Sequence, residues 1–365
     1  MAKIAIVLGD ATITGAPMHV LQLASALKQK KYEILIICPH GPIQKKFAEV
    51  NVLVKEVAMR SPYDRQSAGK IRDILTEFGP EIVHFHGVRA GWLGLLAARN
   101  LKNIKKVYTE HLWTKNYHLS NPAYEQVQKR GLKFLARYAD KIIAVSVAVK
   151  DFLIDSGYEK QKIVLIPNGV EEEFFKLSPI KKPPTAPIIL GAVGSLNDIK
   201  NYRVLIKSFF LLKQERPSLN IHLQIIGEGP LKKNLEGMVS HHRIIEELVS
   251  FAGRVEDIKE RYQHFTIFIN CSLSESFGLA VAEAMAIGLP TVASRIPALE
   301  ELVDDAGILV DPKDKEAIKN AILKLIDNEE LRLTLGAKAK KRIEENFSEK
   351  VMIDKTIELY QGLIK

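Results

Sequence analysis

One stretch restricts the folds open to this chain more than any other: residues 266–290, which read TIFINCSLSESFGLAVAEAMAIGLP. The apolar run Ile267–Ile269 is typical of a buried strand, the polar segment after it of a loop, and the small-residue run from Phe277 of a helix. Such a unit turns the free N–H groups of the first helical turn, around Gly278 and Leu279, toward the loop. The aligned peptide dipoles make that end of the helix an anion site, which glycine opens to a phosphate.

Two carboxylates lie on either side of this predicted anion site. Glu275 precedes the helix, and Glu283 lies about a turn and a half inside it. A carboxylate beside a phosphate is unfavourable unless it accepts hydrogen bonds from hydroxyls. The pair therefore favours a ligand with hydroxyl-bearing rings on both sides of its phosphates, such as a nucleotide sugar. The alternative is an ordinary helix, since acidic residues early in a helix suit its dipole.

Strand and helix patterns alternate along the rest of the chain. The first half opens with a strand at 3–9 and a helix at 16–31; the loop between them lacks G-x-G-x-x-G, which argues against a dinucleotide dehydrogenase. Further strands are predicted at 33–39, 52–58, 81–87, 105–111, 141–146 and 162–171, and helices near 66–78 and at 147–155. This rhythm predicts an α/β fold, a doubly wound parallel sheet with ligands at the carboxyl ends of its strands.

The chain is long enough for two domains. The segment 176–187, KLSPIKKPPTAP, is rich in proline and lysine and lacks periodicity, so it predicts a linker. After it, the second half restarts with a strand, a loop and a helix. The final segment, 348–365, has the pattern of an amphipathic helix.

Composition favours a cytoplasmic protein. No apolar run approaches the roughly 20 residues of a membrane helix. The run Lys3–Leu8 is followed by Asp10 and reads as a first strand, not as a signal peptide. The two cysteines, Cys38 and Cys271, indicate neither a disulfide framework nor a metal cluster.

The formal net charge of +9 is concentrated in the first half, where residues 1–180 carry 26 Lys and Arg against 17 Asp and Glu. Such asymmetry indicates an anionic partner. We find no nucleic-acid motif, so we expect no nucleic acid; a membrane or an anionic lipid-linked acceptor fits better. The alternative is a charge that serves only solubility.

The central stretch resembles the signature of the family 4 retaining glycosyltransferases, in which two glutamates are separated by seven residues. Its extended form, SLSESFGLAVAEAMAIGLPTVAS, is similar along its whole length, and further matches span nearly all of the chain. The resemblance implies the GT-B fold, two doubly wound Rossmann-like domains facing a central cleft, with the C-terminal helix crossing back to the first. It implies an acceptor-side domain at 1–177 plus 348–365 and a domain that binds the nucleotide-sugar donor at 178–347.

The resemblance also implies roles in the donor site. Glu275 would hold hydroxyls of the donor sugar and Glu283 those of the ribose. Lys200 is retained in the segment GSLNDIKN, where its ammonium would neutralise the diphosphate, but Ser195 stands where many members have arginine. Either Arg203 or Arg254 could substitute for that arginine. The alternative for Lys200 is an ordinary surface lysine.

Near the first strand the family has two adjacent glycines; Thr14 replaces the first and Gly15 keeps the second. The full set that the resemblance assigns to the donor is Gly15, Ser195, Lys200, Arg254, Val255, Glu275, Phe277, Gly278, Leu279 and Glu283.

Histidines mark the acceptor-side domain. His84 and His86, two apart on a strand, share a face; without a third ligand at a suitable spacing, zinc is not expected. By resemblance, His86 and His19 belong to the acceptor side, and His111 lies near the reacting sugar. The alternatives are a partly buried helix histidine for His19 and a strand-end histidine bonded to backbone for His111. The predicted catalytic set is His111, Lys200 and Glu275.

The segment 112–138 combines aromatic and basic side chains, among them Trp113, Tyr117, Tyr124 and Arg130. This combination suits a membrane interface or a lipid acceptor, and the alternative is a solvated helix face.

Together these observations predict a retaining hexosyltransferase that moves a sugar from a nucleoside diphosphate, with uridine as the expected base, to a saccharide or lipid-linked saccharide of the cell surface. No Asp-x-Asp occurs, so we expect neither a metal nor another cofactor. We place it in the cytoplasm, with contact to the inner face of the plasma membrane as a further expectation. Two alternatives remain: a nucleotide-sugar epimerase of the same fold, which needs no acceptor, and a non-catalytic partner that binds nucleotide sugars.

Overall fold

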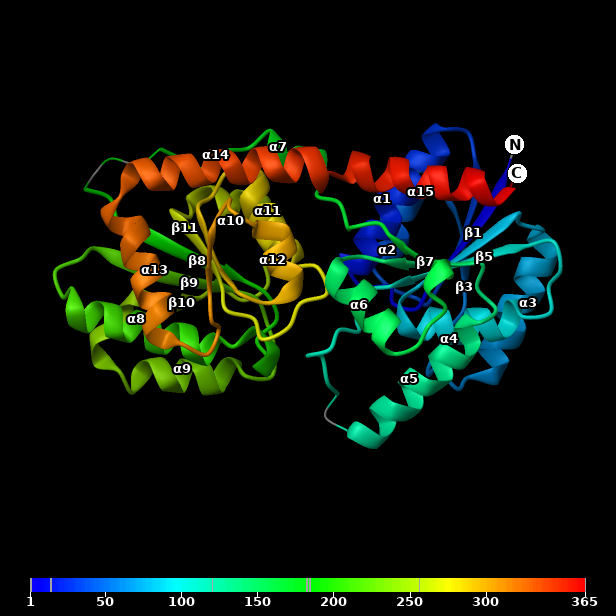
Figure 1. Ribbon diagram of the computed structural model, residues 1–365, viewed down its shortest axis with the longest axis horizontal. Coiled ribbons are helices and arrows are strands. Elements are labelled where there is room, and N and C mark those ends of the chain that lie inside the picture. The colour runs from blue at the N-terminus through cyan, green and yellow to red at the C-terminus, as the bar shows by residue number, and fades with distance from the viewer. Residues whose placement is uncertain are drawn as a thin grey trace. The chain divides into compact units, whose positions relative to one another are not determined.

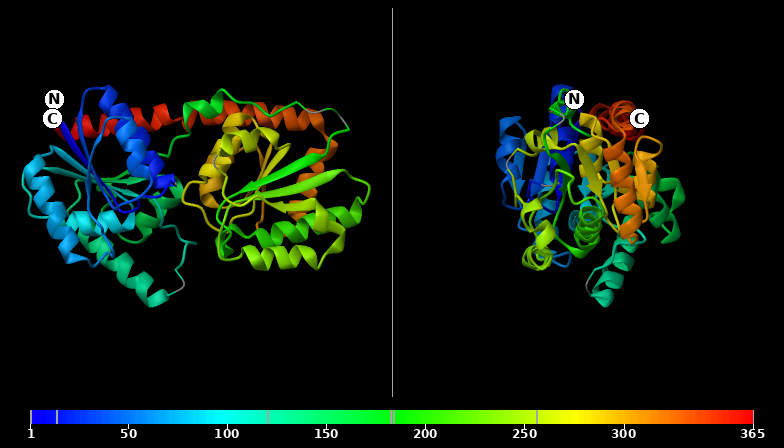
Figure 2. Two further views of the ribbon diagram at one scale, coloured as in Figure 1. Left: turned by 180° about the vertical axis from the view of Figure 1, so that it is seen from behind. Right: turned by 90° about the vertical axis from the view of Figure 1, so that its left-hand side faces the viewer.

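The computed structural model of the protein describes residues 2–13, 15–119, 121–181, 183, 185–255 and 257–364. The chain divides into two compact units, the first formed by Met1–Gly169 with Glu349–Lys365 and the second by Val170–Ser348. Each unit contains one parallel sheet with helices on both faces (Figure 1, Figure 2). The predicted fold class, α/β with two doubly wound sheets, is confirmed.

The first unit has a seven-stranded sheet of order β3-β2-β1-β4-β5-β6-β7, and each neighbouring pair is parallel. Its strands are β1 (Lys3–Leu8), β2 (Glu33–Cys38), β3 (Leu53–Glu56), β4 (Ile82–His86), β5 (Lys105–Glu110), β6 (Lys141–Ala144) and β7 (Ile163–Leu165). Its helices are α1 (Gly15–Gln29), α2 (Ile43–Glu49), α3 (Arg65–Phe78), α4 (Gly87–Ala98), α5 (Pro122–Ala136), α6 (Val147–Asp155), η1 (Lys160–Lys162) and α15 (Glu349–Ile364).

Local sequence explains these elements. The central strands are continuous apolar runs because both faces of a parallel sheet are buried. Helix α1 buries Val20, Leu23 and Leu27 against the sheet, as its periodicity predicts. Asn121 caps α5 by accepting a hydrogen bond from the N–H of Tyr124 (3.1 Å), with proline at the first helical position.

The C-terminal helix α15 belongs to the first unit, as predicted. Its Tyr360 is fully buried, and the phenolic hydroxyl lies 2.5 Å from Nδ1 of His84 on β4. The last residues of the chain therefore complete the core on which the first strands pack.

The second unit has a six-stranded parallel sheet of order β10-β9-β8-β11-β12-β13. Its strands are β8 (Ile188–Val193), β9 (Ile221–Ile226), β10 (Val249–Phe251), β11 (Ile267–Asn270), β12 (Thr291–Ser294) and β13 (Ile308–Val310). Its helices are α7 (Glu172–Phe175), η2 (Asp198–Lys200), α8 (Tyr202–Glu215), α9 (Lys232–Ser240), η3 (Arg243–Leu248), α10 (Ile258–His264), α11 (Leu279–Ile287), α12 (Pro297–Val303), α13 (Lys315–Asp327) and α14 (Glu329–Asn346).

The boundary between the units lies earlier than the expected position after residue 177. The N–H of Val170 donates to the carbonyl of Phe347 (2.8 Å), and that of Ile180 donates to Gln263 (2.8 Å). Lys340 Nζ donates to the carbonyl of Leu177 (3.0 Å). These bonds tie residues 170–181 to the second unit. The proline and lysine content correctly indicated an exposed segment, but it did not show that this segment packs with the second unit.

Both sheets reverse their strand order at one point. In the first unit β1 lies between β2 and β4, and in the second β8 lies between β9 and β11. In open parallel sheets, ligands bind outside the carboxyl ends of the strands at this reversal. The loops that follow β1, β4, β8 and β11 are therefore the places where a site is expected.

Candidate active site

In the second unit, the loops that follow β8 and β11 are joined at the reversal of strand order. The N–H of Leu273 donates to the carbonyl of Ile199 (2.8 Å). Asn201, held at φ 56°, donates its side-chain amide to the carbonyls of Cys271 (3.2 Å) and Pro312 (2.8 Å). These bonds fix the loop that carries Lys200 against the loop that carries Glu275.

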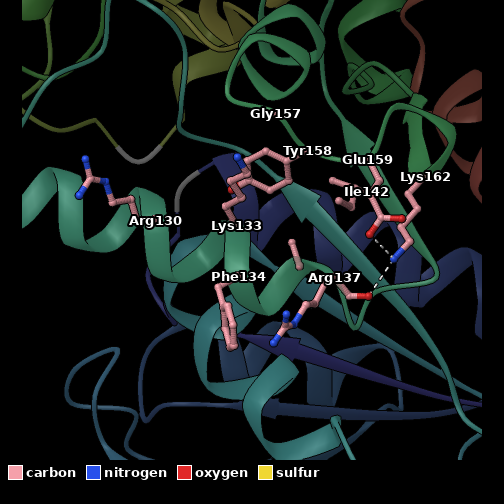
Figure 3. A pocket seen from close by; sticks show the side chains of 10 residues that line it. Arg130, Lys133, Phe134, Arg137, Ile142, Gly157, Tyr158, Glu159 and Lys162 are labelled. Carbon is pink, nitrogen blue, oxygen red and sulfur yellow. Dashed lines mark hydrogen bonds and ion pairs between the residues drawn. The ribbon is translucent and has the colours of Figure 1, made fainter.

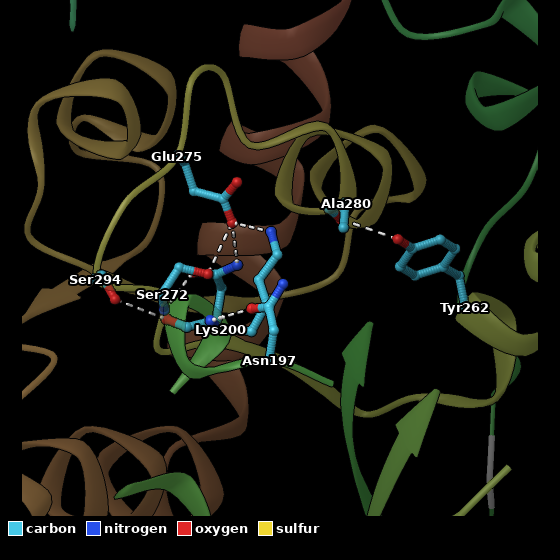
Figure 4. Close-up of polar contacts among 8 residues, drawn as sticks. Asn197, Lys200, Tyr262, Ser272, Glu275, Ala280 and Ser294 are labelled. Atoms are coloured by element: carbon cyan, nitrogen blue, oxygen red, sulfur yellow. Dashed lines mark hydrogen bonds and ion pairs between the residues drawn. The ribbon is translucent and has the colours of Figure 1, made fainter. Parts of the chain in front are cut away.

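Glu275 and Lys200 form an ion pair at this junction (Figure 4). Lys200 Nζ lies 2.6 Å from Glu275 Oε1, and the two side chains are 22% and 11% exposed. The same oxygen accepts from Ser272 Oγ (2.8 Å) and from Asn270 Nδ2 (3.2 Å). Within the described residues, Oε2 of Glu275 accepts no hydrogen bond, so this oxygen is available to a ligand.

Helix α11 begins at Leu279, two residues later than the predicted start at Phe277. Gly278 precedes it at φ 95°, and a Cβ there would lie 2.4 Å from Leu299 Cδ2, so a larger residue would strain the backbone and displace the Leu299 side chain. No side chain caps the helix, and in the described part of the chain the N–H groups of Leu279 and Ala280 donate no hydrogen bond. The expected anion site is thus an uncapped helix N-terminus.

Phe277 contributes to this loop in a different way from the glycine that follows it. Its side chain is buried, with its ring 5.8 Å from that of Phe347. Only the main chain of Phe277 is therefore available to a ligand.

Glu283 faces Tyr262, a residue that the sequence did not single out. The Tyr262 hydroxyl donates to Glu283 Oε2 (2.8 Å) and lies 3.1 Å from the carbonyl of Ala280. Burial raises the pKa of Glu283 to about 7, and the negative charge of Glu171 adds to this, whereas the Tyr262 hydrogen bond and Lys259 lower it. Tyr262 is a buried aromatic of α10, and no motif distinguishes it from an ordinary core residue.

The position of the missing arginine, Ser195, and its two possible substitutes, Arg203 and Arg254, are on the surface. Ser195 and Arg254 are exposed, Val255 is partly buried, and Arg203 approaches Asp198 at 3.9 Å. Lys232 is a cation that sequence reasoning missed. It pairs with Glu228 (2.9 Å), and a Cβ on Gly253 would lie 2.7 Å from Glu228 Oε1, which places this pair beside the loop before Arg254. The turn GEGP after β9 is the signal that could have drawn attention to it.

In the first unit three predicted histidines form one cluster. His19 lies on α1, His86 ends β4, and His111 follows β5. Ring centroids are 5.2 to 5.4 Å apart, and His86 Nδ1 lies 3.1 Å from His111 Nε2. Burial lowers the pKa of all three, that of His19 to about 4. The imidazoles are therefore neutral at pH 7, so that each can donate one hydrogen bond and accept another.

The cluster corrects one expectation. His84 and His86 share a face, with ring centroids 3.9 Å apart, but the fold adds His19 and His111 to the pair. One ring nitrogen from each of His19, His86 and His111 lies within 4.8 Å of the others, and Nδ1 of His19 and Nε2 of His86 are buried without a hydrogen bond to any described residue. These three residues could hold a metal ion. Sequence spacing hid this arrangement because the residues come from separate elements.

His84 has a structural environment. Its Nδ1 lies 2.5 Å from the Tyr360 hydroxyl and its Nε2 lies 2.6 Å from Thr109 Oγ1. Both ring nitrogens are satisfied and buried, so only His86 of the strand pair remains available to a ligand.

A pocket of about 260 Å³ opens at the carboxyl ends of β1 and β4. His86, Asp10, Arg89, Tyr124 and Gln128 are among the residues that line it. Gly15 begins α1 close to this edge of the sheet, and Thr14 lies outside the described residues. The pocket offers aromatic, charged and amide groups, the mixture that recognises hydroxyl-bearing ligands.

The aromatic and basic segment 112–138, expected at a membrane interface, is partly buried in the core. Trp113 is only 1% exposed and packs under Lys129, whose Nζ lies 4.6 Å from the ring centroid. Trp113 is thus a core residue, because the loop after β5 folds inward. The exposed aromatic side chains of this segment, Tyr124 and Phe134, lie on α5 instead. No helix of the described chain is long and apolar enough to cross a membrane.

Comparison with known proteins agrees with this fold. The model of the family described as Glycosyltransferase Family 4 matches residues 13–174, and that described as Glycosyl transferases group 1 matches residues 173–342. The chain belongs to the group 1, family 4 glycosyltransferases and has their GT-B fold.

Three relatives illustrate the likeness. The chain is 25% identical to the capsular polysaccharide biosynthesis glycosyltransferase CapM of Staphylococcus aureus, over 93% of this chain and 92% of the relative. It is 24% identical to the Escherichia coli UDP-Gal:alpha-D-GlcNAc-diphosphoundecaprenol alpha-1,3-galactosyltransferase, over 96% and 95%. The crystal structure of Anabaena HepE in complex with UDP has a TM-score of 0.82 at 19% identity, covering 99% of this chain and 100% of HepE.

Proposed function

We propose that this glycosyltransferase moves a hexosyl residue from a UDP-sugar to an acceptor hydroxyl with retention of the anomeric configuration. The observation that carries the proposal is the environment of Glu275. Its hydrogen bonds with Lys200, Ser272 and Asn270 all end on Oε1. The other oxygen is left for a sugar hydroxyl, in the loop that leads to the uncapped N-terminus of α11.

Two groups of the second unit can stabilise the negative charge on the leaving diphosphate. Lys200 has three ammonium donors, of which one goes to Glu275. The others donate to no described residue, so they can bind phosphate oxygens together with the N–H groups of Leu279 and Ala280. Donors held in place before the reaction stabilise charge as it develops, which is the largest contribution in many enzymes.

The ribose and the donor sugar are assigned to separate carboxylates. Glu283 bonds Tyr262 through Oε2, so its second oxygen, once the group is ionised, can accept from a ribose hydroxyl. Glu275 accepts from the transferred sugar. Neither glutamate serves as nucleophile in this proposal; a diphosphate oxygen takes the proton of the acceptor hydroxyl as that hydroxyl attacks the face the leaving group departs from.

The acceptor is assigned to the pocket of the first unit beside His86. The neutral imidazoles of His19, His86 and His111 can each donate and accept hydrogen bonds, which suits sugar hydroxyls. We propose His111 as the one that contacts the reacting sugar. Lys200 and the helix N-terminus supply the positive charge, so the proposed reaction needs no metal. Turnover measured in the presence of EDTA tests this point, and we expect it to stay within about twofold of turnover without EDTA.

The acceptor class is a saccharide or a lipid-linked saccharide of cell-surface glycan synthesis. Two observations support it: the basic excess of residues 1–180 and the names of the relatives, one of which acts on a diphosphoundecaprenol-linked sugar. An acceptor of this kind would place the enzyme in the cytoplasm, at the inner face of the plasma membrane.

Thermal unfolding with UDP, GDP, ADP and dTDP, each beside several of its sugars, tests the donor assignment. A ligand at a hundred times its Kd stabilises the folded state by about 2.7 kcal/mol, which raises Tm by several degrees. We expect the largest shift with UDP and one UDP-sugar, and no shift in Glu283→Ala. An equal shift with all four bases would contradict a uridine site. Full-rate conversion of the UDP-sugar into its epimer without acceptor, with no net release of UDP, would favour the epimerase.

A further inference from the structure

A second pocket, of about 380 Å³, lies in the first unit between α5 and the loop that joins α6 to β7 (Figure 3). Helix α5 contributes Arg130, Lys133, Phe134 and Ala136 to its lining, and Arg137 follows as the C-cap of the helix. The other wall includes Ile142, Tyr158, Lys162 and the carboxylate of Glu159. This basic pocket is formed by other residues than the pocket beside His86, and the donor and acceptor chemistry above does not use it.

Three cations of the basic pocket have no anionic partner among the described residues. Lys162 pairs with Glu159 (2.9 Å), and its Nζ also donates to the carbonyl of Arg137 (2.8 Å). No carboxylate of the described chain forms an ion pair with Arg130, Lys133 or Arg137. Three unpaired cations around one hollow repel each other and attract an anion with several oxygens, such as a phosphate.

Neighbouring groups contact two of these cations, Arg137 and Lys133. The guanidinium of Arg137 lies 3.7 Å from the ring centroid of Phe134 and 5.4 Å from that of Tyr138. Lys133 reaches over Gly157, where a Cβ would lie only 2.8 Å from its Nζ. Gly157 has φ +75°, a conformation that favours glycine, so the loop leaves room for the ammonium.

The exposed face of α5 alternates basic and apolar side chains. Val127, Arg130, Phe134 and Arg137 follow one another at helical spacing, and Val127 and Phe134 are 53% and 54% exposed. The only acidic residue of α5, Glu125, is buried and paired with Lys129 (2.6 Å). An exposed aliphatic and an exposed aromatic side chain beside cations match a membrane interface, where apolar groups enter the acyl boundary and cations meet lipid phosphates.

We propose that this face of α5 docks on an anionic membrane and that the basic pocket binds the phosphate of a lipid headgroup. This docking rests on the proposed function, and it gives the membrane contact of that function a defined site and a defined ligand chemistry. A nucleic acid would use the cations but has no use for exposed Val127 and Phe134, which is why the membrane is the occupant argued here. Such docking would keep the acceptor pocket of the same unit near its lipid-linked substrate.

Co-sedimentation of the full chain with lipid vesicles tests the site. We compare vesicles of phosphatidylcholine alone with vesicles in which about a third of the lipid is phosphatidylglycerol. The variant Arg130→Gln/Lys133→Gln/Arg137→Gln is matched by Lys70→Gln/Arg99→Gln/Lys102→Gln, which removes the same charge from exposed positions of the same unit.

We expect binding to the anionic vesicles only, with a loss of at least tenfold in the pocket variant and less than threefold in the matched variant. A third variant, Phe134→Ser, is expected to lose binding severalfold without a change in charge. An equal loss in both triple variants, or RNA binding that depends on the pocket while vesicle binding does not, would overturn the proposal.

Vesicle binding needs neither donor nor acceptor, so it can be separated from the transferase assignment. The Tm shift with UDP is measured on the same preparations. Absent vesicle binding with an intact UDP shift contradicts the docking site alone. Intact vesicle binding without any nucleotide shift contradicts the donor assignment and leaves the docking site in place.

Discussion

Lys200 and Glu275 lie 75 positions apart in the sequence, and the Nζ of the one approaches Oε1 of the other to 2.6 Å. The pair is formed because the loops after β8 and β11 meet where the strand order of the second sheet reverses. Glu275 keeps one oxygen free for a ligand, and Lys200 keeps ammonium donors. The arrangement therefore places a carboxylate oxygen that can accept a hydrogen bond from a sugar hydroxyl beside an ammonium that can donate hydrogen bonds to a phosphate.

Replacing Glu275 by glutamine should separate catalysis from nucleotide binding. The amide keeps the shape but loses the charge that fixes Lys200 and accepts sugar hydroxyls, so we expect kcat to fall about 100- to 1,000-fold. The Kd of UDP should change less than threefold. Steady-state kinetics and calorimetry measure the two quantities, with the exposed Glu344→Gln as control. A wild-type kcat in Glu275→Gln would remove Glu275 from the mechanism.

Lys200→Ala should weaken UDP but not uridine, because the ammonium is proposed to bind phosphate and not base or ribose. We expect the Kd of UDP to rise about tenfold or more. Lys207→Ala, an exposed lysine of the neighbouring α8, is the matched control. A parallel loss of uridine binding would show that Lys200 supports the fold of the loop and not the phosphate.

The affinity for UDP should rise with pH around neutrality. Burial raises the pKa of Glu283 to about 7, and only the ionised carboxylate can accept from a ribose hydroxyl at one oxygen while Oε2 accepts from Tyr262. Glu283→Gln should flatten the profile. Tyr262→Phe should move its midpoint upward, because the Tyr262 hydrogen bond lowers this pKa. Calorimetry between pH 5.5 and about 8.5 brackets that pKa by roughly 1.5 units each way and makes the measurement; a flat wild-type profile is the contrary result.

The titration of Glu283 should also make the free energy of unfolding decrease as the pH rises. The pKa of Glu283 is raised in the folded state from its ordinary value of 4.5. Its contribution to the free energy of unfolding is therefore complete below about pH 4.5 and is lost as the pH rises through about 7. Urea unfolding of the wild type and of Glu283→Gln should thus converge at acidic pH, where the neutral acid resembles the amide. A difference that instead grows toward low pH would contradict the raised pKa.

His111→Ala should reduce turnover without affecting the nucleotide. His111 lies in the first unit, beside His86 at 3.1 Å, whereas the residues assigned to UDP are mostly in the second. We expect kcat to fall about 100-fold and the Tm shift with UDP to persist. His40→Ala, at an exposed position of the same unit, controls for loss of a histidine. Abolition of the UDP shift by His111→Ala would refute the separation of roles.

Tyr360→Phe tests the anchoring of the C-terminal helix. The substitution leaves Nδ1 of His84 buried without its partner, which should cost about 1–3 kcal/mol in the free energy of unfolding. Tyr63→Phe, at an exposed ring, should stay within about 0.5 kcal/mol of the wild type. Urea unfolding compares them. Equal stability of the two variants would mean that packing alone holds α15.

The sequence predicted most of the fold because parallel strands and helices have strong periodic patterns. The helix expected at 147–155 is α6, and the strand expected at 33–39 is β2, shorter by one residue. The strand expected at 162–171 is only β7, Ile163–Leu165, since the residues after it leave the sheet. Local apolar content cannot tell where pairing stops, because a neighbouring strand provides the partner.

The site was predicted as separate residues, not as contacts. Lys200 and Glu275 were both named, but their ion pair depends on how two distant loops meet. The cluster of His19, His86 and His111 depends likewise on three elements. Tyr262 was missed because a buried tyrosine has no pattern of its own, and Trp113 was expected at the surface because burial by an inward loop has no sequence signal.

The central claim, transfer from a nucleotide sugar with retention, is tested most directly by proton NMR of the sugar product. The UDP-sugar with the largest Tm shift is incubated with the enzyme and a panel of saccharide acceptors, and the anomer is read in the first minutes, before free sugar equilibrates. The account predicts a product with the anomeric configuration of the donor, and it predicts that Glu275→Gln fails to form this product. A product of inverted configuration, or an unchanged rate in Glu275→Gln, would contradict it.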